Sequence, residues 1–398
     1  MERKMKDVLK INVSLDECMT VEGRNQSICM IGFSGDADGP YFRGKILPWG
    51  VDTQRREPGK PGKLSARYML KGIDYTGRSC KLFIENNGIE ETDGIVRTRP
   101  QIVTDSPALA WMEQAKMRGE IESADGGVVI HITAEEELER GKCDFTENPV
   151  WIRSGMDGCN EMKIYGKLYV PVTTEKCPAV ILSHGYNGSG DDFVRECEYF
   201  ASHGIVALAI DFCGGSSRSR SRGSSLKMSL LTEKADLDAA VDYVKTLKQA
   251  DSEQIFLFGG SQGGFVSALT AAGRPEEIRG LILYYPAFCI PDDWKKKFPG
   301  EEDIPETMEF WGLTLGEDYF HTARSLETFE TIAGYGGPVL LIHGDEDEIV
   351  PLSYSVRARE VYKNAVLITL FAEGHGFTRE GGAVAATETL RFILKNHS

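Results

Sequence analysis

The sequence lacks the features that would assign a protein to a membrane, to zinc or to nucleic acid. No apolar run approaches the roughly 18–20 residues of a membrane-spanning helix, and the charged start, residues 1–7, leads into no apolar signal core. The nine cysteines include no Cys-x-x-Cys pair, so neither a disulfide framework nor a zinc site is indicated. A net charge of -15 provides no basic footprint for nucleic acid or an anionic membrane. These absences predict a cytoplasmic protein with reduced thiols, without a metal, and without a membrane or nucleic-acid partner.

The remaining composition is that of an ordinary globular protein with room for two domains. The chain has 398 residues, of which 41% are hydrophobic and 26% are charged. A charged run without strand pattern, residues 134–142, separates two segments whose patterns differ. We therefore expect a first domain over residues 1–138 and a second domain over residues 139–398.

The first segment consists of short alternating runs that are separated by turn dipeptides. Examples of such runs are residues 9–13, 27–31, 66–70 and 81–84. The segment has one helical candidate, Ser106–Met117. Regularly spaced short strands with little helix predict an all-β domain, either a small barrel or a sandwich.

Three stretches of this segment carry a resemblance: Phe42–Asp52, Ala66–Tyr68 and Glu85–Gly88. On these residues the segment resembles a bacterial family of small β-barrel domains whose function is unassigned, so the resemblance implies no chemistry. Asp52, Arg67 and Asn86 have two interpretations: they line a pocket at the barrel mouth, or they fix turns and paired strands. The domain itself could assist substrate binding, mediate assembly such as a homodimer, or catalyse a separate step. The sequence does not decide among these roles.

From residue 139 onward the pattern changes to strands that alternate with helices. An opening antiparallel pair is expected at residues 150–153 and 164–170. Unbroken apolar runs then predict buried parallel strands at residues 179–182, 205–210, 255–258, 281–284, 339–342 and 366–370. Helical periodicity follows at residues 191–202, 231–247, 263–272, 354–364 and 383–395. Repetition of this kind predicts a doubly wound, mostly parallel α/β sheet, in which the Ser- and Arg-rich run 214–225 is a loop.

Chemically useful residues follow three of the predicted strands. Ser261 lies in a glycine-x-serine-x-glycine sequence directly after an apolar run, which is the pattern of a nucleophile elbow. Gly259 and Gly263 would let neighbouring backbone pass close to this turn. An acidic cluster follows a later strand, and His375 follows the last one. Serine, acid and histidine in this order, each at a strand end, are typical of α/β-hydrolases.

His375 is the expected base and Asp347 the expected acid of a catalytic triad. The serine needs a base to take its proton, and a carboxylate must hold the imidazole tautomer. Among Asp345–Glu348, Asp347 fits the His-Gly-x-x-Asp-x-x-Val-Pro pattern that is usual in α/β-hydrolases, whereas Asp345 is expected to order the turn. His184 is expected to shape its own loop, and His343 to be a packed core histidine.

The oxyanion hole requires two backbone N–H groups that point at the developing negative charge. One is expected from Gln262, the residue after the nucleophile. The other is expected from Tyr186 in the His184-Gly185-Tyr186 sequence, with Gly185 as the fallback. Neither side chain is needed for this role, so replacing Gln262 should have little effect through the hole.

Residues 145–395 resemble the feruloyl (cinnamoyl) esterases of gut and rumen bacteria. The matching stretches include Ser183–Tyr186, Gly259–Gly264, Tyr284–Ala287, Leu315–Tyr319 and Phe329–Thr331. An insertion from Phe288 to about Ala333 forms a cap whose six aromatic rings either hold a flat phenolic acyl group or form the core of the cap. The resemblance implies that Asp293 and Tyr319 reach the phenolic oxygens of the substrate.

Together these patterns predict a serine carboxylesterase that hydrolyses hydroxycinnamate esters through an acyl-enzyme. Its partner would be a small aromatic ester, and the mechanism requires no cofactor. A general short-acyl esterase, a thioesterase or an aminoacyl peptidase with the same triad is the alternative. Peptidases of this fold usually carry a large propeller, for which the first domain is too short. A third interpretation is a ligand-binding protein whose hydrolase half is inactive. The complete triad disfavours this interpretation.

Overall fold

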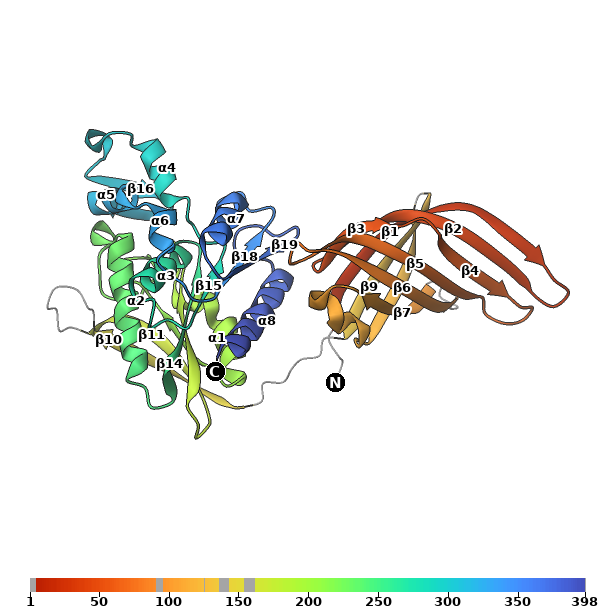
Figure 1. Cartoon of the computed structure of the whole chain (residues 1–398), viewed down its shortest axis with the longest axis horizontal. Coiled ribbons are helices and arrows are strands. Elements are labelled where there is room, and N and C mark those ends of the chain that lie inside the picture. The colour runs from red at the N-terminus through yellow and green to blue at the C-terminus, as the bar shows by residue number, and fades with distance from the viewer. Residues whose placement is uncertain (1–4, 91–95, 125, 136–142, 154–161, 398) are drawn as a thin grey trace. The chain divides into compact units, whose positions relative to one another are not determined.

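The computed structural model describes residues 5–90, 96–124, 126–135, 143–153 and 162–397 (Figure 1). The chain divides into two compact units. The first contains residues 1–138 and 369–372, and the second contains residues 139–368 and 373–398. Most of the predicted linker, from residue 136 to residue 142, lies outside the described residues.

The first unit is a closed antiparallel β-barrel. Its strands are β1 (Met5–Glu22), β2 (Ser27–Asp38), β3 (Phe42–Ile46), β4 (Gly50–Arg56), β5 (Lys63–Asp74), β6 (Ser79–Glu90), β7 (Val96–Thr104), β8 (Met117–Ala124) and β9 (Gly127–Glu135). They pair in the order β1-β9-β8-β7-β6-β5-β3-β2-β4, and the additional pairing of β1 with β2 closes the sheet. The closed sheet confirms the barrel that the alternating runs predict.

Alternation along each strand decides which side chains fill the barrel. On β5, Ala66, Tyr68 and Leu70 are buried, while the residues between them are exposed. Arg67 therefore lies on the outer face, where its guanidinium pairs with Glu85 on the next strand at 3.1 Å. This cross-strand pair excludes Arg67 from the interior and agrees with the interpretation in which it fixes paired strands.

The helix predicted over Ser106–Met117 is wrong in length and type. The structure has a short 3-10 helix, η1 (Pro107–Glu113), and β8 already begins at Met117. The Ser106 hydroxyl accepts a hydrogen bond from the Leu109 N–H and so caps this turn. The alternating burial that starts at Met117 favours a strand over continuation of the helix.

In the described residues, the second unit is built on a sheet of eight strands. The strand order is β10 (Phe145–Arg153), β11 (Met162–Pro171), β13 (Val206–Ile210), β12 (Cys177–Ser183), β14 (Ala250–Gly260), β15 (Gly280–Tyr284), β18 (Val339–Gly344) and β19 (Ala365–Leu370). β10, β11 and β13 pair antiparallel, as the opening pair predicts, and the pairs from β13 through β18 are parallel. This topology confirms the predicted α/β-hydrolase sheet.

Helices cover both faces of this sheet. They are α1 (Val194–Ser202), α2 (Leu230–Lys245), α3 (Gln262–Gly273), α7 (Leu352–Val361) and α8 (Arg379–Asn396) (Figure 1). On β14, Phe258 contacts Phe200 of α1 and Phe256 contacts Phe392 of α8. The alternate residue Leu257 belongs to the core that includes α2 and α3. Within the described part of the chain, none of the helices combines the length and the hydropathy needed to traverse a lipid bilayer.

A cap is inserted between β15 and β18. It contains α4 (Ile290–Lys297), a hairpin of β16 (Thr307–Phe310) and β17 (Leu313–Gly316), α5 (Glu317–Ser325) and α6 (Thr328–Ile332). Trp294, Phe298 and Phe320 are buried and pack on one another, so these rings form the core of the cap. Trp311, at the tip of the hairpin, is 61% exposed.

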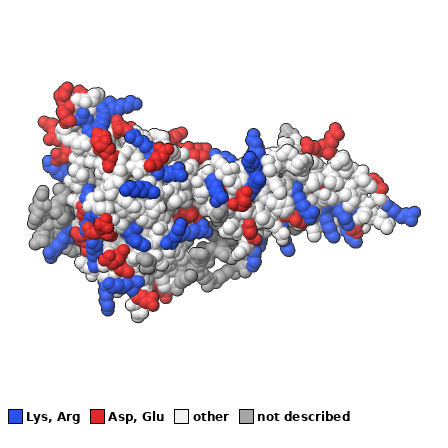
Figure 2. Space-filling view, in the orientation of Figure 1, with Lys and Arg blue, Asp and Glu red and all other residues white. Residues whose placement is uncertain are grey.

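Charged side chains of both signs are interspersed over the face shown in Figure 2. The cap follows the same pattern, because the three lysines Lys295–Lys297 end α4 and the three acids Glu301–Asp303 follow closely. Interspersed charges of this kind favour solubility and do not mark a surface for a strongly charged partner.

Candidate active site

Ser261 occupies a strained turn between a strand and a helix. β14 ends at Gly260 and α3 begins at Gln262, and Ser261 between them has φ 53° and ψ -121°. Residues with a β-carbon rarely adopt a positive φ, and such strain is found mainly at functional sites. A β-carbon on Gly259 would lie 2.2 Å from the Gly263 carbonyl oxygen, and one on Gly263 would lie 2.3 Å from the Ser183 carbonyl oxygen. Both glycines are therefore required by close backbone approach, as predicted.

The structure brings Ser261, His375 and Asp347 together by hydrogen bonds. His375 Nε2 lies 3.0 Å from Ser261 Oγ, and His375 Nδ1 lies 2.8 Å from Asp347 Oδ2. The other carboxylate oxygen of Asp347 accepts the N–H groups of Ile349 at 2.9 Å and Val350 at 2.8 Å. The three side chains come from the segments that follow β14, β19 and β18, which is the strand-end placement expected from the sequence.

The side chain of Asp347 is buried but remains a strong acid. Burial alone would raise the pKa of its carboxyl, yet hydrogen bonds from His343, His375 and the Val350 N–H outweigh this effect. They hold the pKa of Asp347 well below its ordinary value. Asp347 is therefore ionised at neutral pH and can stabilise a protonated His375.

His343 is a second histidine on the acid, which the sequence did not predict. It is fully buried, as expected for a core histidine, and its Nε2 lies 3.0 Å from the Val350 carbonyl oxygen and 3.2 Å from Asp347 Oδ2. Since a carbonyl only accepts, Nε2 carries the proton, and Nδ1 accepts from the Ser355 hydroxyl at 2.7 Å. The available signal was its position four residues before Asp347.

The loop that carries His375 is braced from two sides. Glu373 is buried and accepts the Thr378 N–H at 2.5 Å, and the Thr378 hydroxyl donates to the same carboxylate. On the other side, the ring of Tyr285 lies with its centroid 4.6 Å from that of His375. Tyr285 has a positive φ of 35°, and its N–H donates to the Ile342 carbonyl at 2.8 Å. These contacts restrict the position of the imidazole.

The loop of residues 184–190, from which the second oxyanion donor is expected, runs directly against Ser261; it is called the oxyanion-hole loop below. A β-carbon on Gly185 would lie 3.1 Å from Ser261 Cβ. His184 is buried; its Nδ1–H donates to the Gly185 carbonyl at 2.7 Å, and its Nε2 accepts the Phe212 N–H at 3.0 Å. Burial lowers the pKa of His184, so this neutral imidazole shapes its loop. In the described chain, no protein acceptor takes the N–H of Gln262 or Tyr186.

The Gln262 side chain is part of a buried hydrogen-bond chain. Its Oε1 accepts the Tyr319 hydroxyl at 2.7 Å, and its Nε2 donates to Glu233 Oε2 at 2.8 Å. Burial raises the pKa of Glu233 to about 8, although the bond from Gln262 opposes this rise. The sequence missed Glu233. Its signal was an acidic residue in line with the apolar face of α2, three residues after Leu230 and four before Leu237.

The two predicted substrate contacts occupy different environments. Tyr319 is 1% exposed, and its hydroxyl is bound to Gln262. Asp293 is exposed on α4 and faces Cys289, whose thiol pKa is raised by burial and by this carboxylate. Contact of either residue with a substrate therefore remains a prediction.

The cap hairpin is bound to the oxyanion-hole loop. The Tyr186 hydroxyl donates to the Phe310 carbonyl at 2.6 Å, and Asn187 Nδ2 donates to the Trp311 carbonyl at 3.1 Å. Asn187 Oδ1 accepts the Ser217 N–H at 2.9 Å, which ties in the loop 214–225. Asn187 has a positive φ of 52°, which is a strained backbone conformation for a residue other than glycine. The hydrogen bonds of its side chain hold the residue in this conformation.

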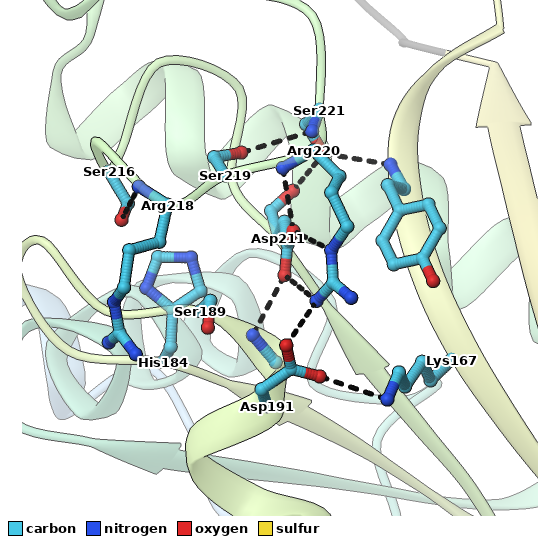
Figure 3. Close-up of polar contacts among 12 residues, drawn as sticks. Lys167, His184, Ser189, Asp191, Asp211, Ser216, Arg218, Ser219, Arg220 and Ser221 are labelled. Carbon is cyan, nitrogen blue, oxygen red and sulfur yellow. Dashed lines mark hydrogen bonds and ion pairs between the residues drawn. The ribbon is translucent and has the colours of Figure 1, made fainter.

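The Ser- and Arg-rich loop is ordered by ion pairs. Figure 3 shows Arg220 between Asp211, at 3.1 Å, and Asp191, also at 3.1 Å, with Lys167 completing the group. Asp211 also accepts the Gly190 N–H at 2.8 Å, which fixes the end of the oxyanion-hole loop. Arg218 pairs with Asp192 at 2.9 Å. The predicted loop is present, and these arginines are used internally.

Family models and known proteins match the two units separately. A model described as the prolyl oligopeptidase family matches residues 192–397, and one described as a protein of unknown function (DUF3237) matches residues 4–134. A UPF0311 protein of Clostridium acetobutylicum is 32% identical over 133 residues, which are 28% of this chain and 80% of that protein. The human acylamino-acid-releasing enzyme is 24% identical over 197 residues, which are 46% of this chain but 25% of that enzyme.

Among solved structures, Est1E from Butyrivibrio proteoclasticus with ferulic acid bound is 30% identical, with a TM-score of 0.55. The match covers 58% of this chain and 95% of Est1E. These similarities agree with the sheet order and with the elbow serine of a serine hydrolase. The chain thus belongs to the prolyl oligopeptidase family of α/β-hydrolases and carries an N-terminal β-barrel domain of the DUF3237 family.

Proposed function

We propose that this protein is a serine carboxylesterase that hydrolyses feruloyl, caffeoyl or coumaroyl esters. The observation that carries the reaction type is the hydrogen-bonded series Ser261–His375–Asp347. We assign the oxyanion hole to the N–H groups of Gln262 and Tyr186. A nucleophile, a base, an orienting acid and two oxyanion donors are the groups that acyl transfer requires. They are the five groups named from the sequence.

Each step has an assigned group. His375 Nε2 takes the proton of Ser261 as Oγ attacks the ester carbonyl carbon, and the resulting oxyanion accepts the N–H groups of Gln262 and Tyr186. The carbon–oxygen bond to the alcohol then breaks, and the alcohol leaves with the proton held by His375. A water molecule, deprotonated by His375, attacks the acyl-enzyme. Collapse of the second intermediate releases the acid and returns the proton to Ser261.

Three observations support an aromatic acyl group. Est1E, with ferulic acid bound, is similar over 95% of its length. The rings of Tyr186, Phe310 and Trp311 lie together beside the oxyanion-hole loop, with centroid distances of 5.3 Å from Tyr186 to Phe310 and 4.7 Å from Phe310 to Trp311. Since Trp311 is largely exposed, this group presents aromatic surface beside the loop that carries Tyr186. Asp293 and Tyr319 would then contact the phenolic oxygens.

An aminoacyl peptidase is the second candidate. The family description and the similarity to the acylamino-acid-releasing enzyme favour it. That similarity covers a quarter of the enzyme, and the first unit here is a small β-barrel. A thioesterase or a general short-acyl esterase would use the same five groups and differ only in the cap.

The decisive experiment compares kcat/KM for methyl ferulate, chlorogenate, p-nitrophenyl butyrate, an acyl-CoA and acetyl-alanine p-nitroanilide. We expect the highest value with a hydroxycinnamate ester. A preference for p-nitrophenyl butyrate by orders of magnitude would reject the phenolic substrate and keep the esterase. Preferred cleavage of the anilide would favour the peptidase. The Ser261→Ala chain is the control, and full activity in it would reject the assigned nucleophile.

A further inference from the structure

The interior of the β-barrel contains polar side chains that have no role in the hydrolase site. Asn86 is 0% exposed, and Tyr68 and Thr98 are each 3% exposed. Within the described residues, no hydrogen-bond partner is present for the Tyr68 hydroxyl, for either amide atom of Asn86, or for the Thr98 hydroxyl. Asp52 Oδ1 is likewise buried and unpaired, while its Oδ2 accepts from Gln54 at 2.9 Å.

Strand register places these side chains in one continuous patch on the inner wall. Asp52, Ala66, Asn86 and Pro100 are paired in a single row across β4, β5, β6 and β7. Tyr68 lies two residues from Ala66, and Thr98 lies two residues from Pro100. Because side chains two apart share a face, and diagonal neighbours are about 7–8 Å apart, Tyr68 and Thr98 flank Asn86 on the inner face.

The surrounding wall is apolar. The neighbouring interior positions are Phe33, Leu70, Ile84 and Ile102, which are all buried. The Phe33 ring packs edge-on against Tyr68, with centroids 5.3 Å apart. Apolar neighbours cannot supply the missing hydrogen bonds, and native proteins pair nearly all of their buried polar atoms.

The same barrel contains a buried carboxylate whose hydrogen bonds are all made. Asp74, which is 0% exposed, accepts from the Thr76 N–H at 2.9 Å, the Thr76 hydroxyl at 2.6 Å and the Ser106 hydroxyl at 2.5 Å. This is how the chain treats a buried polar group with a structural role. Asn86, Tyr68 and Thr98 differ because their hydrogen-bonding capacity is directed inward and left unused by the protein.

We propose that the barrel interior is a binding site for a small uncharged molecule that carries hydroxyl groups on a compact ring. Asn86 would donate and accept, the hydroxyls of Tyr68 and Thr98 would do either, and Asp52 would accept from a ligand hydroxyl. The apolar wall formed by Phe33 and its neighbours would contact the ring of the ligand. Phenols and sugars share this chemistry.

The charges of the interior argue against an anionic ligand. Among the described residues of the barrel, no lysine or arginine is buried, and Arg67 lies on the outer face. The only carboxylate in the patch is Asp52, whose pKa burial raises above its ordinary value. A ligand carboxylate would meet Asp52 without a cation to balance the two charges. The site therefore does not fit the free acid that the hydrolase unit would release.

The test is calorimetric titration of the full-length chain with catechol as the phenol and D-xylose as the sugar. We expect saturable binding of at least one probe, weakened about 10-fold or more in Asn86→Leu and in Tyr68→Phe, since each variant removes a hydrogen bond made in a desolvated site. Arg67→Ala is the matched control, because it changes the neighbouring position on β5, whose side chain points outward. The affinity of this variant for the probe should stay within about 2-fold of that of the unsubstituted protein. The probe that binds identifies the phenol or the sugar as the source.

Thermal unfolding of each variant separates a binding role from a structural one. A binding site tolerates Tyr68→Phe without loss of stability, because the removed hydroxyl bonds to no protein group. If neither probe binds, or if Asn86→Leu and Arg67→Ala bind equally well, the proposal is overturned and the patch holds water only. Hydrolysis of methyl ferulate should be unchanged in all three variants, so failure here is distinguishable from failure of the proposed esterase.

Discussion

Replacing Glu233 by glutamine should reduce the loss of folding stability that occurs between pH 7 and pH 9. Glu233 is buried, and this burial raises its pKa from the ordinary value of 4.5 to about 8. Between these two values the carboxyl of Glu233 binds a proton in the folded chain that it has lost in the unfolded chain. The contribution of Glu233 to stability is therefore complete below pH 4.5 and is lost as the pH rises through 8. From pH 7 to pH 9 the ionised fraction of the folded form rises enough to lower the free energy of unfolding by about 1.4 kcal/mol.

The range from pH 7 to pH 9 isolates this carboxyl from its neighbour. Burial also raises the pKa of Asp236, to about 6, so Asp236 is already ionised at pH 7. In Glu233→Gln the side-chain amide oxygen can still accept the hydrogen bond from Gln262 Nε2. The hydrogen bonds that connect residue 233 through Gln262 to Tyr319 are therefore kept. Thermal unfolding is measured at both pH values for the unsubstituted protein and for the variant. Between pH 7 and pH 9 the Tm of the unsubstituted protein should fall by about 3–5 °C more than the Tm of the variant.

An exposed acid provides the control for this measurement. Glu276 is exposed after α3, and Glu276→Gln should retain the full dependence on pH. If Glu233→Gln loses as much stability between pH 7 and pH 9 as the unchanged chain does, Glu233 is not the titrating group. The assignment of its raised pKa to burial behind Gln262 would then be refuted.

Three further substitutions test the hydrolase site. Gly185→Ala should lower kcat for methyl ferulate by about 10²-fold, because its β-carbon would press on Ser261 and displace the oxyanion-hole loop; an unchanged kcat would contradict the close approach. His343→Ala should lower kcat for methyl ferulate, because Asp347 loses one of the hydrogen bonds that hold its carboxylate in place against His375; an unchanged kcat with lower Tm would indicate a packing role alone. Trp311→Ala should raise KM for methyl ferulate several-fold and leave p-nitrophenyl butyrate within about 2-fold, and equal losses on both esters would reject an aromatic subsite.

The parts of the site that the sequence predicts are those set by short-range pattern. Ser261, Asp347 and His375 could be named because apolar runs mark the strands and polar residues follow their carboxyl ends. The parallel sheet then places these residues at one edge. An all-β barrel or sandwich could likewise be expected from the alternation of apolar and polar residues along the first segment. The closure of the barrel by β1 and β2 could not, because it depends on contacts between distant residues.

The parts that the sequence does not predict depend on which elements meet. The bond from Gln262 to Glu233 joins α3 to α2, and the bond to Tyr319 joins α3 to the cap, so neither follows from spacing along the chain. The positive φ of Tyr285 comes from hydrogen bonds across β15 and β18, not from a glycine that would signal it. His343 looked like an ordinary core residue because its contact with the acid requires the folded loop.

The hydrogen bonds between the cap hairpin and the oxyanion-hole loop have a consequence for how this hydrolase can change its substrates. Tyr186 supplies both an expected oxyanion donor, through its backbone, and a tether to Phe310, through its hydroxyl. A substitution that shifts the hairpin to admit a different acyl group also shifts the loop that stabilises the transition state. Substrate range and turnover are therefore thermodynamically linked here, and a change of specificity through the hairpin must be accompanied by repair of Tyr186 and Asn187.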